Sequence, residues 1–162
     1  MAVRLVDPLI SFQFRLELNG MTGYFTEVDG IFSENPVATH KVVTPAGKEV
    51  VLHVPGRADG DQMTFKRGLT TNAEFWQWRE KVITGNLRDA RVDGSVIMFN
   101  RAYQEVRRWS FINAWPSKIS GPQIASDSND FAIEELTIVH EGLWLDAPGI
   151  GAPNRAPDGP AA

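Results

Sequence analysis

Residues 10–18 alternate without a break between apolar and polar side chains, and this period of two constrains the fold more than any other feature of the sequence. In ISFQFRLEL the apolar residues fill every second position, and Ser, Gln, Arg and Glu lie between them. Such alternation is typical of a β-strand that has one face against a core and one face in solvent. Turn residues at 19–23 and a second short strand at 24–28 extend the prediction to an antiparallel hairpin.

Similar patterns predict further strands. Residues 38–43 and 48–54 flank the sequence Thr44-Pro45-Ala46-Gly47, which predicts a long hairpin with a loose turn. Other strands are expected at 61–67, 92–99, 106–113 and 131–143. The consecutive apolar residues from Val96 to Phe99 indicate that their strand is buried on both faces.

One helix interrupts this pattern. The sequence Thr71-Asn72-Ala73-Glu74 matches a capping box with Thr71 as N-cap, and Gly85 is a suitable residue just after the last turn. At 100° per residue, Phe75, Trp78 and Val82 form one apolar stripe. Trp76 and Ile83 form a second stripe, so the apolar arc is wider than a single core contact requires.

The chain of 162 residues is long enough for one domain, which we assign to residues 1–146. The remaining segment, 147–162, is rich in Pro, Ala and Gly and is expected to be a flexible tail. The strands and the helix together predict a β-rich architecture, with one helix packed on a barrel or sandwich.

Composition excludes several function classes. Sixteen Lys and Arg against 20 Asp and Glu give a net charge of −4, which disfavours nucleic-acid binding. The absence of cysteine excludes disulfides, thiolate metal sites and cysteine nucleophiles. No apolar run approaches the length of a membrane-spanning helix, and the first ten residues carry no signal-peptide pattern.

No pattern of residues indicates catalysis. The histidines are His40, His53 and His140, and no acidic residue lies at a familiar metal-ligand spacing from them. The phosphate-binding, dinucleotide-binding and nucleophile-elbow motifs are absent. We therefore expect no enzyme activity, no cofactor and no metal.

Five tryptophans in a domain of this size are more aromatic surface than one small core normally buries. The excess is explained equally well by surfaces for association and by a monomer with a large, well-packed core.

Several sequence segments favour association surfaces over a large monomeric core. The segments ISFQFRLEL, GYFTEVDGI, VPGR and MTFKRGLT, and above all WSFINAWPSKISGP with AIEELTIVHEGL, resemble the inner tail tube proteins of contractile phage tails and phage-like contractile injection systems. Their order and spacing also match, over about residues 8–145. One departure is the turn at 101–104, where the family usually has a glycine and this chain reads Arg-Ala-Tyr-Gln.

The resemblance implies a mainly β fold, in which two antiparallel sheets form a barrel-like sandwich with one flanking α-helix. It implies hexameric rings, closed by strand pairing at sheet edges and stacked into a hollow tube. The implied partners are further copies of the chain, a surrounding sheath protein, baseplate and spike proteins, and cargo or DNA in the lumen. Assembly would take place in the bacterial cytoplasm, as part of a phage-like tail or injection particle.

The resemblance also implies roles for particular residues. Trp76 and Ile83 would lie at the subunit interface, and the segments 113–116 and 120–122 would be framework turns. The 37–55 hairpin would reach the next ring, and its candidate contact residues are Val37, His40, Val42, Lys48, Val50 and Leu52. The lumen wall is expected to be polar and mildly negative, with the candidates Gln13, Arg15, Glu17, Glu135, Thr137 and Glu141.

Two other functions remain open at this point. One is a small β-barrel that binds an apolar ligand in its interior. The other is a hydrolase with a site that no motif reveals.

Overall fold

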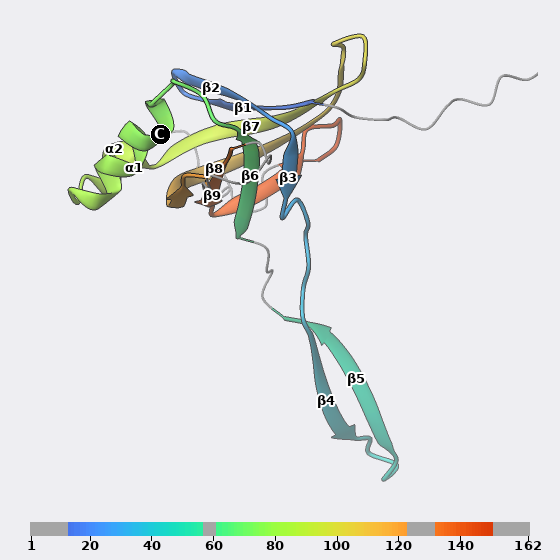
Figure 1. Ribbon diagram of the computed structural model, residues 1–162. Coiled ribbons are helices and arrows are strands. Elements are labelled where there is room, and N and C mark those ends of the chain that lie inside the picture. Colours follow the sequence, from blue (N-terminus) through green and yellow to red (C-terminus); the bar gives the residue numbers. More distant parts are fainter. Residues whose placement is uncertain (1–12, 57–60, 123–131, 151–162) are drawn as a thin grey trace, which may run out of the picture.

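The computed structural model describes residues 13–56, 61–122 and 132–150 (Figure 1). Strands dominate these residues, as the alternating patterns predict. In chain order the elements are β1 (Gln13–Leu18), β2 (Met21–Phe25), β3 (Glu27–Asp29), β4 (Val37–Val43), β5 (Glu49–Pro55), β6 (Gln62–Gly68), α1 (Glu74–Ile83), α2 (Leu87–Ala90), β7 (Val92–Phe99), β8 (Glu105–Ser120), β9 (Ile133–Val139) and β10 (Gly142–Leu145).

One long antiparallel sheet folds over on itself to make two layers. Its strand order is β2-β1-β7-β8-β9-β6-β3, and β10 also pairs with β8. Strand β8 belongs to both layers, because its first part pairs with β7 and β10 and its last part pairs with β9. The first layer is therefore β2, β1, β7, β10 and residues 105–114 of β8; the second layer is residues 115–120 of β8 with β9, β6 and β3.

The chain also passes from one layer to the other at Thr26, between β2 and β3. The Thr26 backbone N–H donates to the carbonyl oxygen of Lys66 over 2.9 Å. The two end strands of the sheet, β2 and β3, thus follow each other in the chain without pairing into a closed barrel. The predicted mainly β sandwich with one flanking helix is confirmed, and α2 adds a single helical turn.

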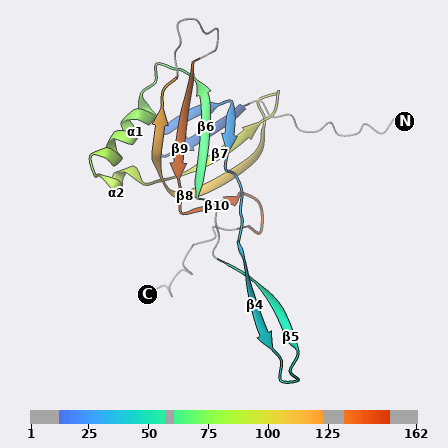
Figure 2. The same ribbon diagram turned by 60° about the horizontal axis from the view of Figure 1, so that its bottom comes forward.

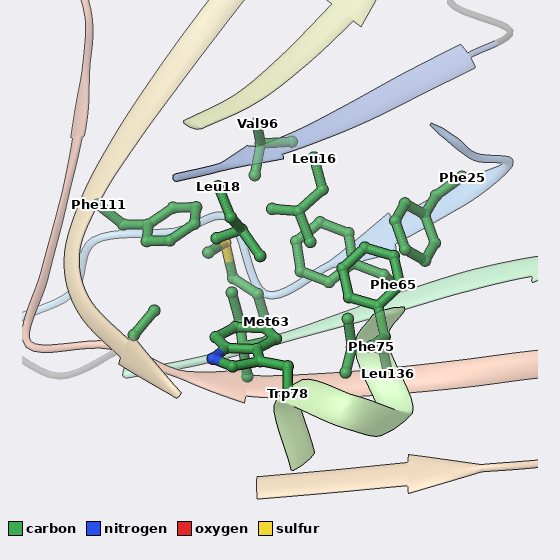
Figure 3. Packing of buried hydrophobic residues seen from close by; sticks show 12 residues of the cluster. Leu16, Leu18, Phe25, Met63, Phe65, Phe75, Trp78, Val96, Phe111 and Leu136 are labelled. Atoms are coloured by element: carbon green, nitrogen blue, oxygen red, sulfur yellow. The ribbon is translucent and has the colours of Figure 1, made fainter. Parts of the chain in front are cut away.

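Apolar side chains from both layers and from α1 fill the space between the sheets (Figure 3). Phe25 lies between Phe65 and Phe75, with ring centroids 5.1 and 5.8 Å away. Trp78 is 1% exposed, and its indole N–H donates to the carbonyl oxygen of Ala90 over 2.6 Å. Because these side chains fill the interior and the sheet does not close, the alternative of a barrel around an apolar ligand loses its basis.

The β4–β5 hairpin extends away from the sandwich, beyond the ends of β3 and β6 (Figures 1 and 2). The predicted turn is confirmed: the Gly47 N–H donates to the Thr44 carbonyl over 2.8 Å, and Gly47 has a φ of 77°. At the root, the Gly56 N–H donates to the Pro36 carbonyl over 2.6 Å. The Asn35 side-chain amide donates to the Gly56 carbonyl over 2.9 Å.

The predicted capping box of α1 is wrong, although the predicted end of the helix is right. The N-cap is Ala73 without a side-chain cap, and the Asn72 carboxamide oxygen accepts from the Glu74 N–H over 2.8 Å. At the other end of the helix Gly85 has a φ of 84°, and its N–H donates to the carbonyl oxygen of Val82. The N–H of the next residue, Asn86, donates to the carbonyl oxygen of Lys81, and this bond completes a Schellman motif.

Two expected boundaries in the C-terminal half also differ from the structure. The segment 113–116 is not a turn, because β8 continues through it for 16 residues. Asn113 instead forms a bulge with a φ of 50°, and its N–H donates to the Asp93 carboxylate over 2.9 Å. The final strand, predicted as one element at 131–143, is divided at His140–Glu141 into β9 and β10.

Two expectations fall partly or wholly outside the described residues. Residues 10–12 of the first predicted strand lie outside them, and so do residues 151–162 of the expected tail. Within 147–150, the Ile150 N–H donates to the Ala147 carbonyl over 3.1 Å, which closes a turn.

Candidate assembly surfaces

The hairpin has one apolar face and one mixed face. Antiparallel pairing sets His40 opposite Leu52 and Val42 opposite Val50, and residues directly opposite each other share a face. One face is therefore free of Asp, Glu, Lys and Arg, and it consists of Ala38, His40, Val42, Val50, Leu52 and Val54. Leu52 is 46% exposed, so this apolar face lies open in the subunit.

The other face of the hairpin is mixed. It carries Lys41 and Glu49, whose charged groups are 3.5 Å apart. Of the predicted contact residues, Val37 belongs to this face at the root, and Lys48 closes the turn through a backbone bond to Thr44. The remaining four predicted residues share the apolar face.

The register also separates two of the histidines. His53 pairs with Thr39 and so lies on the mixed face, opposite to the face of His40. Within residues 13–56, 61–122 and 132–150, no group of three or more His, Asp or Glu could hold a metal ion. No helix in the same residues is long and apolar enough to cross a membrane.

Helix α1 divides its apolar residues as the two stripes predict. Phe75 and Trp78 are each 1% exposed and face the core, and Val82 is half-buried. Trp76 and Ile83 lie on the outer side and are 45% and 63% exposed. The second stripe is therefore apolar surface that the described part of the subunit covers only in part.

A buried ion pair anchors Trp76. Its indole N–H donates to Oε1 of Glu134 over 2.7 Å, and Arg67 Nε donates to Oε2 of the same carboxylate over 2.8 Å. Sequence reasoning missed this arrangement. The signal was present, because Arg67 and Glu134 occupy the apolar phase of their strands, in line with Phe65 and Leu136.

The outer face of the second layer is a polar ladder. In one cross-strand row Glu27 lies opposite Lys66, which lies opposite Glu135. In the next row Thr64 and Thr137 are neighbours, with their hydroxyl oxygens 3.3 Å apart. Two of the predicted lumen residues, Glu135 and Thr137, belong to this face.

The outer face of the first layer carries an ion network. The Glu17 carboxylate oxygens lie 2.6 Å from Nη2 of Arg15 and 3.3 Å from Nη1 of Arg108. Nε of Arg108 also lies 2.8 Å from Oε1 of Glu105. The hydrogen bond from Arg108 lowers the pKa of Glu105, and the same bond raises the pKa of Arg108. Below this network Ile97 is fully buried, which confirms the prediction that β7 is buried on both faces.

The six predicted lumen residues do not share a surface. Gln13, Arg15 and Glu17 point away from the core on the first layer, whereas Glu135 and Thr137 point away from it on the second layer. Glu141 lies at the break between β9 and β10, where its carboxylate accepts from the Asn113 side-chain amide over 2.7 Å. The core separates the first two groups, so one channel wall cannot contain both.

Comparison with solved structures finds a similar fold in chains of three of them. The chain is similar to a chain of the PVC sheath–tube complex of an extracellular contractile injection system in its extended state, with 20% identity, 87% of this chain and 93% of that chain covered, and a TM-score of 0.68. A chain of the anti-feeding prophage baseplate matches with 15% identity, 87% and 97% coverage and a TM-score of 0.67. Hcp1 from Flavobacterium johnsoniae matches with 18% identity, 87% and 98% coverage and a TM-score of 0.55.

Sequence comparison gives the family. No curated protein sequence matches the chain significantly. The profile of the T4-like virus tail tube protein gp19 family matches residues 10–144, which include both layers, the hairpin and α1. The chain therefore belongs to the T4-like virus tail tube protein family, and it is a structural tube subunit rather than an enzyme.

Proposed function

We propose that the chain builds the inner tube of a contractile tail or injection system, as hexameric rings stacked around a hollow lumen. The observation that carries the proposal is the β4–β5 hairpin of a tail tube family member, which extends from the body with an uncovered apolar face. Contiguous apolar surface on a projecting element marks a site of protein contact. The proposal assigns this contact to a subunit of the adjacent ring.

Ring closure uses the two edges of the second layer that pair with no further strand among the described residues. One edge is β3, and the other is the outer side of residues 115–120 of β8, where β7 no longer pairs. An unpaired strand edge favours pairing with another chain, and head-to-tail pairing of two different edges generates a ring when the rotation closes.

Helix α1 lies beside the β8 edge, where Arg79 donates to the carbonyl oxygen of Pro116 over 3.3 Å. A neighbouring subunit that approaches this edge also meets the outer side of α1. This geometry supports the assignment of Trp76 and Ile83 to the subunit interface.

The polar outer face of the second layer is the proposed lumen wall. The middle rows of this side are polar, whereas Ile133 and Val139 lie on it at the two ends of β9. In chain order β3 precedes the hairpin and β6 follows it. Its charges nearly balance, with Glu27, Asp29 and Glu135 against Lys66 and Lys118. Such a wall offers few attractive sites to a passing polymer. Glu135 and Thr137 then line the lumen, while Gln13, Arg15 and Glu17 face outward.

The proposed partners follow from this arrangement. The outward ion network of the first layer would face a surrounding sheath, and the ends of the tube would meet baseplate and spike proteins. The similar structures come from a sheath–tube complex and a baseplate, which supports these assignments. Assembly in the bacterial cytoplasm and passage of cargo or DNA through the lumen complete the proposal.

A shortened hairpin tests the two levels of assembly separately. Residues 42–50 are replaced by Asn-Gly, which suits a two-residue turn between the paired residues Lys41 and Val51. Native mass spectrometry and negative-stain microscopy should find rings of six subunits but no tubes. The full-length control Val43→Thr, on the mixed face, should still give tubes. Normal tubes from the shortened chain would contradict the role of the hairpin, and a monomeric wild-type chain would contradict the ring.

A further inference from the structure

The second layer ends in two edges whose residues belong to the same cross-strand rows. Among the described residues β3 pairs only with β6, and residues 115–120 of β8 pair only with β9. Figure 2 shows β3 at one side of this layer and β8, with α1 beside it, at the other. The registers of the strands between them therefore tell which residues of the two edges lie level with each other.

One of these rows has opposite charges at its two ends. It runs across the outer face of the layer from Lys118 through Thr137 and Thr64 to Asp29. Lys118 and Asp29 are both exposed. Within residues 13–56, 61–122 and 132–150 neither of them forms an ion pair, and the Asp29 carboxylate accepts only from the N–H of Gly30, over 2.8 Å. Each edge thus carries one charge that has no counter-charge in the described part of the subunit.

The adjacent row ends in two apolar residues. It lies on the core side of the layer, with Ile119 at the β8 edge and Val28 at the β3 edge. Both side chains are partly buried and pack against the core. If the two edges of neighbouring copies meet at the same level, Val28 meets Ile119 and the core continues across the boundary, while Asp29 meets Lys118 on the outer face.

The strand directions permit this contact. Each pair of neighbouring strands in the layer is antiparallel, so β3 and β8, which are three steps apart, run in opposite directions. Rotation about a ring axis brings the β3 edge of one copy against the β8 edge of the next. The new strand pair is then antiparallel as well, and residues directly opposite each other share a face.

Other registers fit less well. A shift by one residue sets outward polar side chains against core-facing apolar ones. A shift by two residues toward the start of β8 sets Asp29 opposite Pro116, which is fully buried and has no N–H to donate. A shift by two in the other direction sets Asp29 opposite Ser120 and leaves Lys118 unmatched. Glu27, the other acidic residue of β3, already has Lys66 of its own subunit 3.6 Å away.

We propose that Asp29 of one subunit and Lys118 of the next form an ion pair that sets the register of the ring contact. The inference rests on the proposed closure of the ring and adds the two residues that align its edges. The occupant of each edge is a second copy of this chain. The pair also sets the orientation of the neighbour, because two β3 edges or two β8 edges would bring like charges together.

Charge reversal in mixed rings tests the pair. Asp29→Lys leaves a subunit with a cation at both edges, and Lys118→Asp leaves one with an anion at both edges. Each variant alone should form rings at least about tenfold less readily than the wild type, because every contact brings like charges together. An equimolar mixture should recover rings in which the two variants alternate, and native mass spectrometry should find three copies of each.

The matched control is Glu135→Lys, which makes the same change of charge on the same face but inside the sheet. It should keep rings without a partner variant. Wild-type levels of rings from either edge variant alone, or no recovery in the mixture, would overturn the ion pair while leaving the ring itself intact. Failure of the wild-type chain to form rings would instead contradict the proposed function.

Engineered cysteines measure the register independently of charge, because the chain has no cysteine of its own. Asp29→Cys with Lys118→Cys sets two thiols directly opposite each other, and Asp29→Cys with Ser120→Cys is the control shifted by two residues on the same face. Opposite Cβ atoms are about 4.5–5.5 Å apart, whereas diagonal ones are separated by more than a disulfide spans.

Oxidised rings of the directly opposite pair should give a ladder of up to six linked subunits on a non-reducing gel. We expect these links to form at least about tenfold faster than in the shifted control. Equal or faster linking of the shifted control, or no linking of the opposite pair in assembled rings, would overturn the register.

Discussion

Arg67 and Glu134 form an ion pair inside the sandwich, with Arg67 Nε 2.8 Å from Oε2 of Glu134 and both side chains at most 7% exposed. The guanidinium carbon of Arg67 lies 5.4 Å from the ring centre of Phe25 and 4.9 Å from that of Phe75. The pair thus connects β6 and β9 to the helix, and it fixes the indole of Trp76 at the outer surface.

Removing one member of this pair should destabilise the subunit strongly. Glu134→Leu leaves Arg67 buried without its counter-charge, which costs about 3–5 kcal/mol of unfolding free energy. The double variant Arg67→Met, Glu134→Leu should recover much of that loss, because no charge remains buried. Urea unfolding followed by tryptophan fluorescence measures both.

The control for this experiment is Lys66→Met, which removes the exposed partner of Glu27. It should cost less than about 1 kcal/mol, as exposed ion pairs usually do. Equal stability losses for Lys66→Met and Glu134→Leu would mean that the buried pair has no special role.

The two sides of α1 should separate folding from assembly. Trp78→Ala should cost about 3–5 kcal/mol of stability, as is usual for a buried large aromatic. Ile83→Ala changes an exposed residue and should alter stability by less than about 0.5 kcal/mol, yet weaken the ring. Thermal melts measure the stability of each variant, and native mass spectrometry measures its ring formation. A larger loss of stability for Ile83→Ala than for Trp78→Ala would refute the stripe assignment. Trp76→Ala is a less clean probe, since it also removes a hydrogen bond to Glu134.

His140 should make the stability of the subunit depend on pH. The side chain is 3% exposed, and neither ring nitrogen has a hydrogen-bond partner within the described part of the chain. Burial lowers the pKa of His140, and the negative charge of Asp61 opposes this effect only in part. The unfolded chain therefore binds a proton more readily than the folded chain.

Because of this difference, stability is complete above the ordinary histidine pKa of about 6.5 and falls as the pH drops below it, by at most about 1.4 kcal/mol per pH unit. Urea titrations between pH 7.5 and 5 should show a shallower loss for His140→Leu than for the wild type. His53→Leu, on the exposed hairpin, serves as the control. A constant difference between the wild type and His140→Leu at every pH would refute the prediction.

Two glycines with the same backbone conformation should respond differently to alanine. Gly20 and Gly30 have φ angles of 84° and 89°. A Cβ at Gly20 meets open space, so Gly20→Ala should cost only the left-handed strain of about 1–2 kcal/mol. A Cβ at Gly30 would overlap the carbonyl oxygen of Gln62, so Gly30→Ala should add about 1–3 kcal/mol and disturb the pairing of β3 with β6. Similar melting temperatures for the two variants would contradict this reading of the β3 edge.

Local sequence patterns predicted the elements whose causes are local. The alternation at the start of the chain, the hairpin turn at Gly47 and the end of the helix at Gly85 all depend on side chains a few residues apart. The division of α1 into a buried and an exposed stripe was predictable for the same reason.

Most features that sequence reasoning missed depend on contacts between distant segments; the start of α1 is a local exception, because Asn72 rather than Thr71 accepts from the Glu74 N–H. Asn113 suggested a turn, but Asp93 from β7 holds its N–H and turns it into a bulge within β8. The final strand breaks at His140 because β9 and β10 pair with different parts of β8. The predicted lumen residues separated into two groups because the sequence alone did not show that β1 and β9 belong to opposite layers.

Cryo-electron microscopy of the purified 162-residue chain tests whether it assembles into stacked hexameric rings. We expect hollow rings of six subunits, joined through the edges of the second layer, with Glu135 and Thr137 on the lumen wall. We also expect rings stacked into tubes to place each hairpin against the adjacent ring. A uniform monomer at micromolar concentration, without rings or tubes, would contradict this assembly, and so would a ring whose lumen is lined by Arg15 and Arg108 of the first layer.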